Sequence, residues 1–226
     1  MPDIQQTAFG ETSFAENPEN RCPCVLLLDI SSSMSGPAIQ ELQRGVEQYR
    51  DELLDDPLAR KRVEVAIITF GGTVQTPQTF ATADTFFVPL LQANGNTPMS
   101  GALIEAYRLL EGRKAEYKSH GITYYRPWIF LITDGEPTDD TRLWQQAVQK
   151  AREVSDAKGA TLFVIGVKGA NTAKLSELPA ANGVLSLDGV RFKDLFAWLS
   201  QSQKGIARSR PGDELALPPA TWVITT

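Results

Sequence analysis

The chain of 226 residues is 42% hydrophobic, which is enough for one large α/β domain with a buried core. Its net charge of −5 and its scattered basic residues argue against a nucleic-acid-binding protein. No apolar run approaches the roughly 20 residues of a membrane-spanning helix, and the start of the chain lacks the apolar stretch of a signal peptide. We therefore expect a cytoplasmic protein that binds neither nucleic acid nor membrane.

The pattern along the chain predicts one domain between two polar ends. Residues 1–20 are polar and aperiodic and predict a flexible arm, residues 21–203 form the domain, and residues 204–226 form a C-terminal tail. In the tail, Trp222 is expected to pack back onto the domain, the alternative being a docking peptide. Cys22 and Cys24 are poorly spaced for a mutual disulfide and are expected to be buried at the first strand.

Strands and helices alternate within the domain. Apolar runs predict strands at residues 24–28, 63–70, 128–132, 161–167 and 184–187, and a short antiparallel edge strand is predicted at residues 73–76. Apolar residues spaced by three or four predict helices near residues 39–53, 103–110, 144–154, 172–178 and 192–199. This alternation predicts a doubly wound, mostly parallel α/β sheet with helices on both faces.

Side chains that carry oxygen follow two of these strands, at the edge where an α/β sheet presents its binding groups. Asp29, Ser31 and Ser33 follow the first strand at steps of two, so in an extended loop they point to the same side. Thr97 adds a hydroxyl from a second loop, and Asp134 adds a carboxylate after the fourth strand in chain order, at residues 128–132. Such donors suit an octahedral Mg²⁺ (or Mn²⁺) ion that keeps one or more waters.

The two carboxylates would neutralise the ion and leave a coordination position for an acidic side chain of a partner protein. Taken singly, the same residues have structural explanations. Asp29 and Asp134 suit turns or helix caps, the serines suit a capping loop, and Thr97 suits an N-cap before a first-turn proline. Their combination, in this order and in this fold, favours the metal site.

These residues resemble a known motif. Asp29-x-Ser31-x-Ser33, then Thr97, then Asp134-Gly135 match the metal-ion-dependent adhesion site of von Willebrand factor type A domains, over roughly residues 22–200. The resemblance implies a six-stranded, Rossmann-like sheet with one antiparallel edge strand. It also implies Ser31, Ser33 and Thr97 as direct or near-direct ligands, with Asp29 and Asp134 binding partly through water. Ser32 stands where the family usually has glycine, which would change the flexibility of the loop.

Within that family, residues 124–135 resemble the bacterial TerY-type branch, which is linked to tellurium and stress resistance. Short intracellular members of this branch are similar to the chain in length. The resemblance implies a protein kinase or phosphatase as a partner.

Two other functions are compatible with parts of the pattern. In a hydrolase or phosphotransferase, Asp29 or Ser33 would be the nucleophile, but the single histidine, His120, lies in a distant segment and no glycine-rich phosphate loop is present. The other alternative is a scaffold with a vestigial metal site. We predict a binding module that is not an enzyme.

A polar, tyrosine-containing insertion at residues 113–126 precedes the fourth strand and is expected at the end of the sheet opposite the metal. Its tyrosines Tyr117, Tyr124 and Tyr125 suggest a second docking surface for a partner. The alternative is that they cover the end of the sheet.

Overall fold

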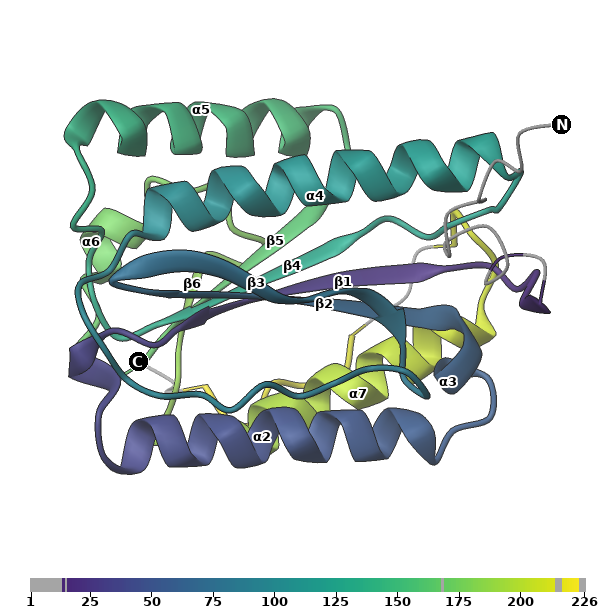
Figure 1. Ribbon diagram of the computed structural model, residues 1–226, viewed down its shortest axis with the longest axis horizontal. Helices are drawn as coiled ribbons and strands as arrows, with labels where there is room; N and C mark the ends of the chain where they lie inside the picture. Colours follow the sequence, from purple (N-terminus) through teal and green to yellow (C-terminus); the bar gives the residue numbers. More distant parts are fainter. Residues whose placement is uncertain (1–13, 15, 168, 214–216, 224–226) are drawn as a thin grey trace, which may run out of the picture.

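The computed structural model describes residues 14, 16–167, 169–213 and 217–223 (Figure 1). Six strands form one sheet in the order β3-β2-β1-β4-β5-β6. The strands are β1 (Cys22–Asp29), β2 (Val63–Gly71), β3 (Thr73–Thr82), β4 (Trp128–Thr133), β5 (Thr161–Gly166) and β6 (Val184–Ser186). Only the β2–β3 pair is antiparallel within this sheet, and β3 is an edge strand. The predicted fold class is therefore confirmed.

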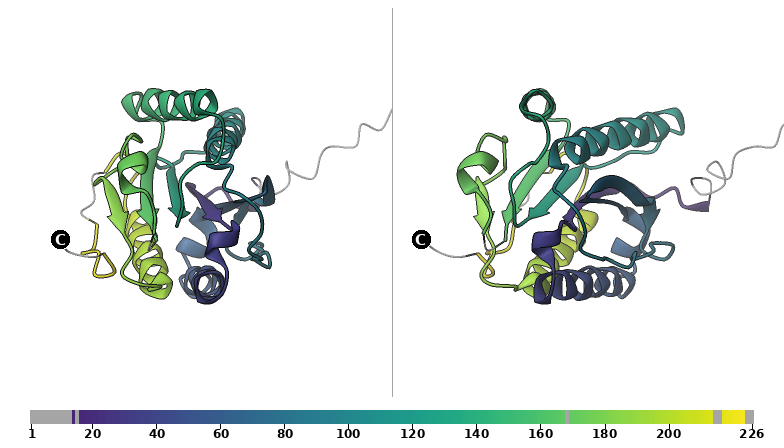
Figure 2. Two further views of the ribbon diagram at one scale, coloured as in Figure 1. Left: turned by 90° about the vertical axis from the view of Figure 1, so that its left-hand side faces the viewer. Right: turned by 60° about the vertical axis from the view of Figure 1, so that its left-hand side comes forward.

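Helices cover both faces of the sheet. They are η1 (Ser32–Met34), α2 (Pro37–Leu54), α3 (Ala59–Arg62), α4 (Met99–Ser119), α5 (Thr141–Asp156), α6 (Thr172–Leu175) and α7 (Phe192–Arg208). In Figure 1, α4 and α5 lie above the sheet and α2 and α7 lie below it, and Figure 2 shows the same layers from two other sides. Each face buries its own apolar cluster, which explains why β1 and β4 are buried along their whole length.

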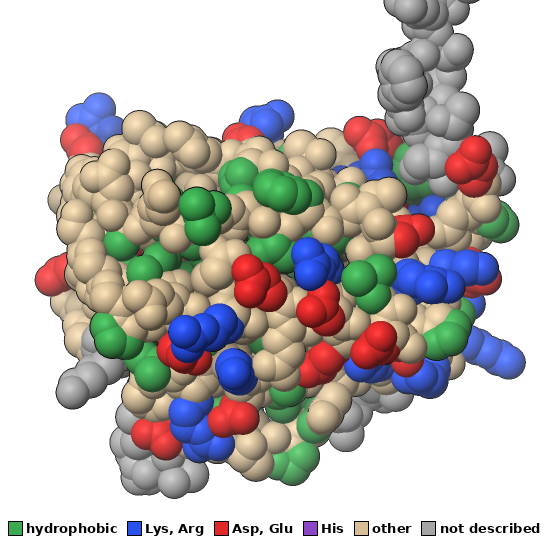
Figure 3. Space-filling view, turned by 60° about the horizontal axis from the view of Figure 1, so that its bottom comes forward, with side chains coloured by type: hydrophobic (Ala, Val, Ile, Leu, Met, Phe, Trp, Pro, Cys, Tyr) green, Lys and Arg blue, Asp and Glu red, His purple; other side chains and the backbone are tan. Residues whose placement is uncertain are grey.

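The strand order positions the predicted site. β1 pairs in parallel with β2 on one side and β4 on the other, and Leu28 lies opposite Ile132. The loops after β1 and β4 therefore leave the same edge of the sheet side by side, as expected. On the face that carries α2, charged side chains of both signs are interspersed (Figure 3).

Two elements are longer than the sequence pattern predicted. β3 continues past Pro77 to Thr82, because an edge strand has one side on which a missing N–H is tolerated. α4 continues to Ser119, so the first part of the predicted insertion at residues 113–126 is helical. The last turns of α4 are polar but still helical, since ion pairs such as Lys114 with Glu111 and Arg113 with Glu116 link neighbouring turns.

Both ends of the described chain contact the domain. Glu19 pairs with Arg62, and Asn17 donates a hydrogen bond to the carbonyl of Lys61, whereas residues 1–13 and 15 of the predicted flexible arm lie outside the described residues. α7 runs to Arg208, beyond the predicted domain end at residue 203.

In the tail, Trp222 is fully buried, and its ring centroid lies 5.7 Å from that of Trp198, so the prediction that it packs back is confirmed. Cys22 and Cys24 are buried free thiols, also as predicted. Among the described helices, none has the length and apolar character needed to span a bilayer.

Candidate metal centre

Asp29 ends β1 and is buried at the carboxyl end of the sheet. Its Oδ1 accepts a 2.8 Å hydrogen bond from the backbone N–H of Ser31, and its Oδ2 accepts a 2.6 Å bond from Oγ1 of Thr133, the last residue of β4. Both donors are neutral, so neither compensates the charge of the carboxylate. Burial raises the pKa of Asp29 above its ordinary value, and the hydrogen bonds oppose that rise only in part.

The two serines bring their hydroxyls together on the same side of the loop. Oγ of Ser31 and Oγ of Ser33 lie 3.0 Å apart, and Oγ of Ser33 donates a 2.7 Å hydrogen bond to Oδ1 of Asp134. Ser31 is buried, Ser33 is exposed and Asp134 is half-buried. The oxygens of the first loop therefore meet the carboxylate of the loop after β4, and the group is open to solvent on the Ser33 side.

Thr97 comes from the connection between β3 and α4 and is buried. Its hydroxyl lies against Gly135, where a Cβ atom would come within 3.6 Å of Oγ1. Its backbone N–H donates a 3.0 Å hydrogen bond to Oγ1 of Thr138, and its carbonyl accepts a 3.0 Å bond from the N–H of Thr138. Thr97 is thus fixed beside the loop that carries Asp134.

Asp139 strengthens this connection. Its Oδ2 accepts a 2.6 Å hydrogen bond from the N–H of Ser100, in the first turn of a helix that has no side-chain cap of its own. A carboxylate is favourable at that place because the helix dipole is positive there. We call Thr138 and Asp139 the Thr97 clamp.

Sequence reasoning missed Thr133 and both residues of the Thr97 clamp. All three lie in or next to the polar run that follows β4, which was the only signal available. A hydrogen bond to a separate loop has no fixed spacing in the sequence, so the run alone does not reveal which residues support the site.

The donor set fits a small, hard dication. It combines two carboxylates with three hydroxyls, which are oxygen ligands suited to Mg²⁺ or Mn²⁺. Across the described ranges, no three His, Cys, Asp or Glu side chains gather as a metal-binding group, so a site rich in imidazole or thiolate is not formed there. Neither Asp29 nor Asp134 forms an ion pair with a described residue. A bound dication would balance both charges.

The opposite end of the sheet holds a different polar cluster. Glu64, in β2, is buried and pairs with Arg21 at 2.9 Å and with Arg113 at 2.8 Å. It also accepts a hydrogen bond from the hydroxyl of Tyr117. We call these four residues the Glu64 cluster. Each charge in it meets an opposite charge within the protein, so it is closed to further ligands.

The tyrosines predicted as a docking surface lie at this end, as expected. Tyr117 is fully buried and Tyr125 is 5% exposed, while Tyr124 is half-buried and lies 5.2 Å from Tyr117 between ring centroids. Their burial supports the alternative that they cover the end of the sheet. His120 is at the end of α4, where its Nδ1 lies 2.8 Å from the carbonyl of Glu116, remote from Asp29 and Ser33.

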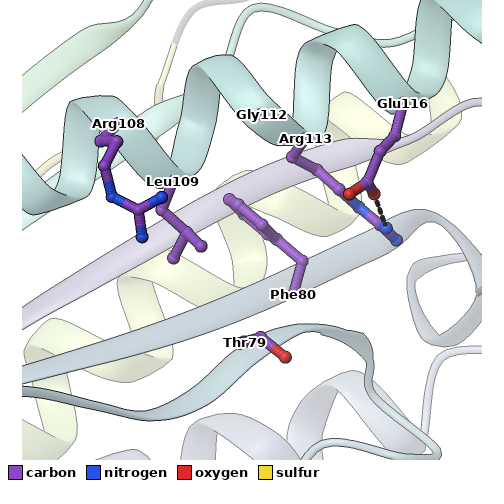
Figure 4. Close-up of a pocket in the computed structure, with 7 residues that line it drawn as sticks. All are labelled: Thr79, Phe80, Arg108, Leu109, Gly112, Arg113 and Glu116. Atoms are coloured by element: carbon purple, nitrogen blue, oxygen red, sulfur yellow. Dashed lines mark hydrogen bonds and ion pairs between the residues drawn. The ribbon is translucent and has the colours of Figure 1, made fainter.

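A hollow of about 340 Å³ lies near this cluster, between Phe80 of β3 and the outer face of α4 (Figure 4). Its two arginines are already occupied: Arg113 pairs with Glu64 and Glu116, and Arg108 pairs with Glu105. The hollow therefore offers no unpaired cation to a ligand.

The fold and the loop geometry define a class of protein, and a family model identifies it. The model of the von Willebrand factor type A domain matches residues 24–194. The chain belongs to this family. A comparison with curated proteins found no match.

Solved structures share the fold at low sequence identity. A von Willebrand factor type A protein from Catenulispora acidiphila has a TM-score of 0.61 and 18% identity, over 82% of this chain and 43% of that one. The domain of the type V pili tip protein Mfa5 from Porphyromonas gingivalis has a TM-score of 0.65 and 13% identity, over 88% and 99% of the chains. Manganese-loaded TRAP protein from Plasmodium vivax has a TM-score of 0.52 and 19% identity, over 78% and 73%. The chain thus spans less than half of the first of these proteins.

Proposed function

We propose that this protein is a divalent-cation-dependent protein-binding module. Asp29, Ser31, Ser33, Thr97 and Asp134 would hold a Mg²⁺ or Mn²⁺ ion, and an acidic side chain of a partner protein would complete the site. When bound, the ion would supply positive charge at an open coordination position. The chain's own residues fix the place of that position and leave its Ser33 side accessible.

One observation carries this proposal. Two carboxylates, Asp29 at the end of β1 and Asp134 after β4, lie beside the loop that carries Ser31 and Ser33, and their hydrogen-bond donors among the described residues are all neutral. An uncharged side chain in place of Asp29 would satisfy the fold at lower cost, since an uncompensated buried carboxylate is unfavourable. A cation that binds there would explain why both charges are present.

The geometry of the site argues against a hydrolase more strongly than against a scaffold with a vestigial metal site. A Ser-His-Asp hydrolase requires the base within hydrogen-bond reach of the nucleophile, and His120 lies at the other end of the sheet. The two oxygens of Asp29 both accept hydrogen bonds, which is the environment of a positioned ligand rather than of a free nucleophile. A scaffold with a vestigial site remains the competing function, and it predicts no metal binding.

We also propose, on the resemblance of residues 124–135 to the TerY-type branch, that the module acts in the cytoplasm in bacterial tellurium or stress resistance. A protein kinase or phosphatase is the partner that this resemblance suggests. Two solved structures with the same fold support protein binding and metal binding in this proposal. One is a pilus adhesin, SpaC from Lactobacillus rhamnosus GG, and the TRAP protein is described as manganese-loaded.

The test is a calorimetric titration of Mn²⁺ into chelator-stripped protein. We expect saturable binding near one ion per chain, lost in Asp134→Ala and kept in Asp156→Ala, which removes an exposed carboxylate at the end of α5. Absence of binding in the wild type would favour the scaffold. Equal binding in Asp134→Ala would place the ion elsewhere.

A further inference from the structure

The segment that leads to Thr97 exposes two large apolar side chains. Residues 86–97, which we call the strap, form most of the connection from β3 to α4, and in Figure 1 this connection runs past α2. Phe87 is 61% exposed and Leu90 is 75% exposed. The only other exposed large hydrophobic side chain in the described part of the chain is Val190, at 41%. Isolated exposed apolar residues are ordinary, but two on one short segment beside a candidate binding site are informative.

The strap is held firmly, so this exposure does not reflect a loose loop. Phe86, Val88 and Leu91, which lie next to the exposed positions in the sequence, are buried in the core. The N–H of Phe87 donates a 3.0 Å hydrogen bond to Oε1 of Gln78, and the N–H of Leu91 donates a 2.8 Å bond to Oε1 of Gln43 in α2. A rigid surface of this kind presents apolar side chains with little entropic cost on binding.

The strap also forms one wall of a cleft next to the metal loop. The cleft has a volume of about 260 Å³, and its lining includes Ile30, Thr69, Gln75, Pro89, Leu90 and Asn94, with no charged side chain. Ile30 lies between Asp29 and Ser31, and its carbonyl accepts a 2.7 Å hydrogen bond from the N–H of Asn94. The loop that carries the candidate ligands Asp29 and Ser31 therefore also lines the cleft.

Charge is distributed unequally around the candidate site. The loop after β4 carries Glu136, Asp139 and Asp140, whereas the strap carries no charged residue at all. A partner segment that brings an acidic side chain to the metal is repelled by the acidic loop after β4 and meets no charge repulsion along the strap. The uncharged strap is thus the side along which such a segment can continue.

We propose that the partner is a polypeptide in which the metal-binding Asp or Glu is flanked by an apolar side chain that packs against Leu90, Pro89 and Ile30, the apolar part of the cleft lining. This inference rests on the proposed metal-dependent function. It fits the anatomy of protein interfaces, in which an apolar contact beside a polar anchor supplies much of the affinity.

Two short synthetic peptides, acetylated and amidated, test this inference. Each carries a single central Glu, flanked by Leu in one peptide and by Ser in the other, and each is titrated by fluorescence anisotropy with Mn²⁺-loaded protein. We expect the Leu-flanked peptide to bind at least about tenfold more tightly. Leu90→Asp should remove that advantage.

Val190→Asp is the matched control, because it introduces the same charge after β6, at the other edge of the sheet. It should leave the advantage of the Leu-flanked peptide unchanged. A loss of that advantage in Val190→Asp but not in Leu90→Asp would overturn the proposed direction of the partner segment.

The outcomes separate this inference from the function on which it rests. Equal, metal-dependent binding of both peptides would overturn the role of the strap and leave acid capture standing. Failure of both peptides to bind protein that takes up Mn²⁺ normally would contradict acid capture itself, and the inference with it. Sedimentation of the free protein tests whether a second copy of the chain binds the strap instead. Self-association that Leu90→Asp abolishes would assign the strap to that second copy and overturn the inference.

Discussion

The two ends of the sheet each contain a cluster of polar side chains, and the two clusters differ in their charge balance. At the amino end, buried Glu64 meets two arginines and a tyrosine, and the cluster is complete within the chain. At the carboxyl end, Asp29 and Asp134 meet only hydroxyl and amide donors among the described residues. Polar side chains gathered at a sheet end therefore do not by themselves indicate a binding site. The indication comes from charge that the protein leaves uncompensated.

The largest effect that tests this difference is expected at the amino end. Glu64→Gln would leave Arg21 and Arg113 without their buried counter-charge and should lower the free energy of unfolding by about 3–5 kcal/mol. Urea denaturation measures this loss. Glu116→Gln is the control, because the exposed Glu116 pair should contribute less than about 1 kcal/mol. Equal losses in the two variants would mean that the Glu64 cluster is not a closed structural unit.

At the carboxyl end, the corresponding change should weaken metal binding without lowering stability. Asp29→Asn keeps an acceptor for the N–H of Ser31 but removes the charge. It should weaken Mn²⁺ binding by at least about 100-fold, the upper end of the effect of losing a supporting residue. In chelator, its free energy of unfolding should equal or exceed that of the wild type, because a buried, uncompensated carboxylate is gone. A large loss of stability in chelator would show that Asp29 is a structural residue.

The Thr97 clamp should produce a smaller effect on the same site. Thr138→Val removes the hydroxyl that accepts from the N–H of Thr97 and should weaken Mn²⁺ binding by about tenfold, whereas Thr138→Ser should restore it. Calorimetric titration of both variants, with thermal unfolding in chelator beside it, distinguishes positioning from general damage. Thr138→Val with unchanged Mn²⁺ affinity would show that the clamp does not position Thr97 for the ion.

The smallest expected effect is on the pH dependence of stability. Burial raises the pKa of Asp29 in the folded state, so its ionisation is less favourable there than in the unfolded chain. In chelator, protonation of Asp29 therefore stabilises the folded protein, and this contribution is fully present at pH values below the pKa that Asp29 has in the unfolded chain. It is lost as the pH rises through the folded pKa.

The stability of Asp29→Asn relative to the wild type should therefore increase as the pH rises through the acidic range. Urea denaturation of both proteins in chelator, at a series of pH values, measures this trend. A difference that stays constant with pH would mean that the carboxylate is compensated in the folded protein.

Much of this protein was determined by local sequence. The continuous apolar runs of β1, β2, β4 and β5 predict strands buried on both faces, because only a covered parallel sheet needs them. The steps of two from Asp29 to Ser33 predict side chains that point to one side, and the structure brings their oxygens together. Thr97 and Asp134 were predicted as ligands because each lies in a loop next to a recognisable element.

What the sequence did not determine depended on contacts between distant segments. The polar end of α4 was assigned to an insertion outside the helix, since its pattern gives no sign that Tyr117 and Arg113 turn inward to Glu64, far away in the chain. The partners of Thr138 and Asp139 were equally hidden. The tertiary structure alone decided which polar clusters are closed, because charge compensation depends on distances in space, and these are not encoded in the spacing of residues along the chain.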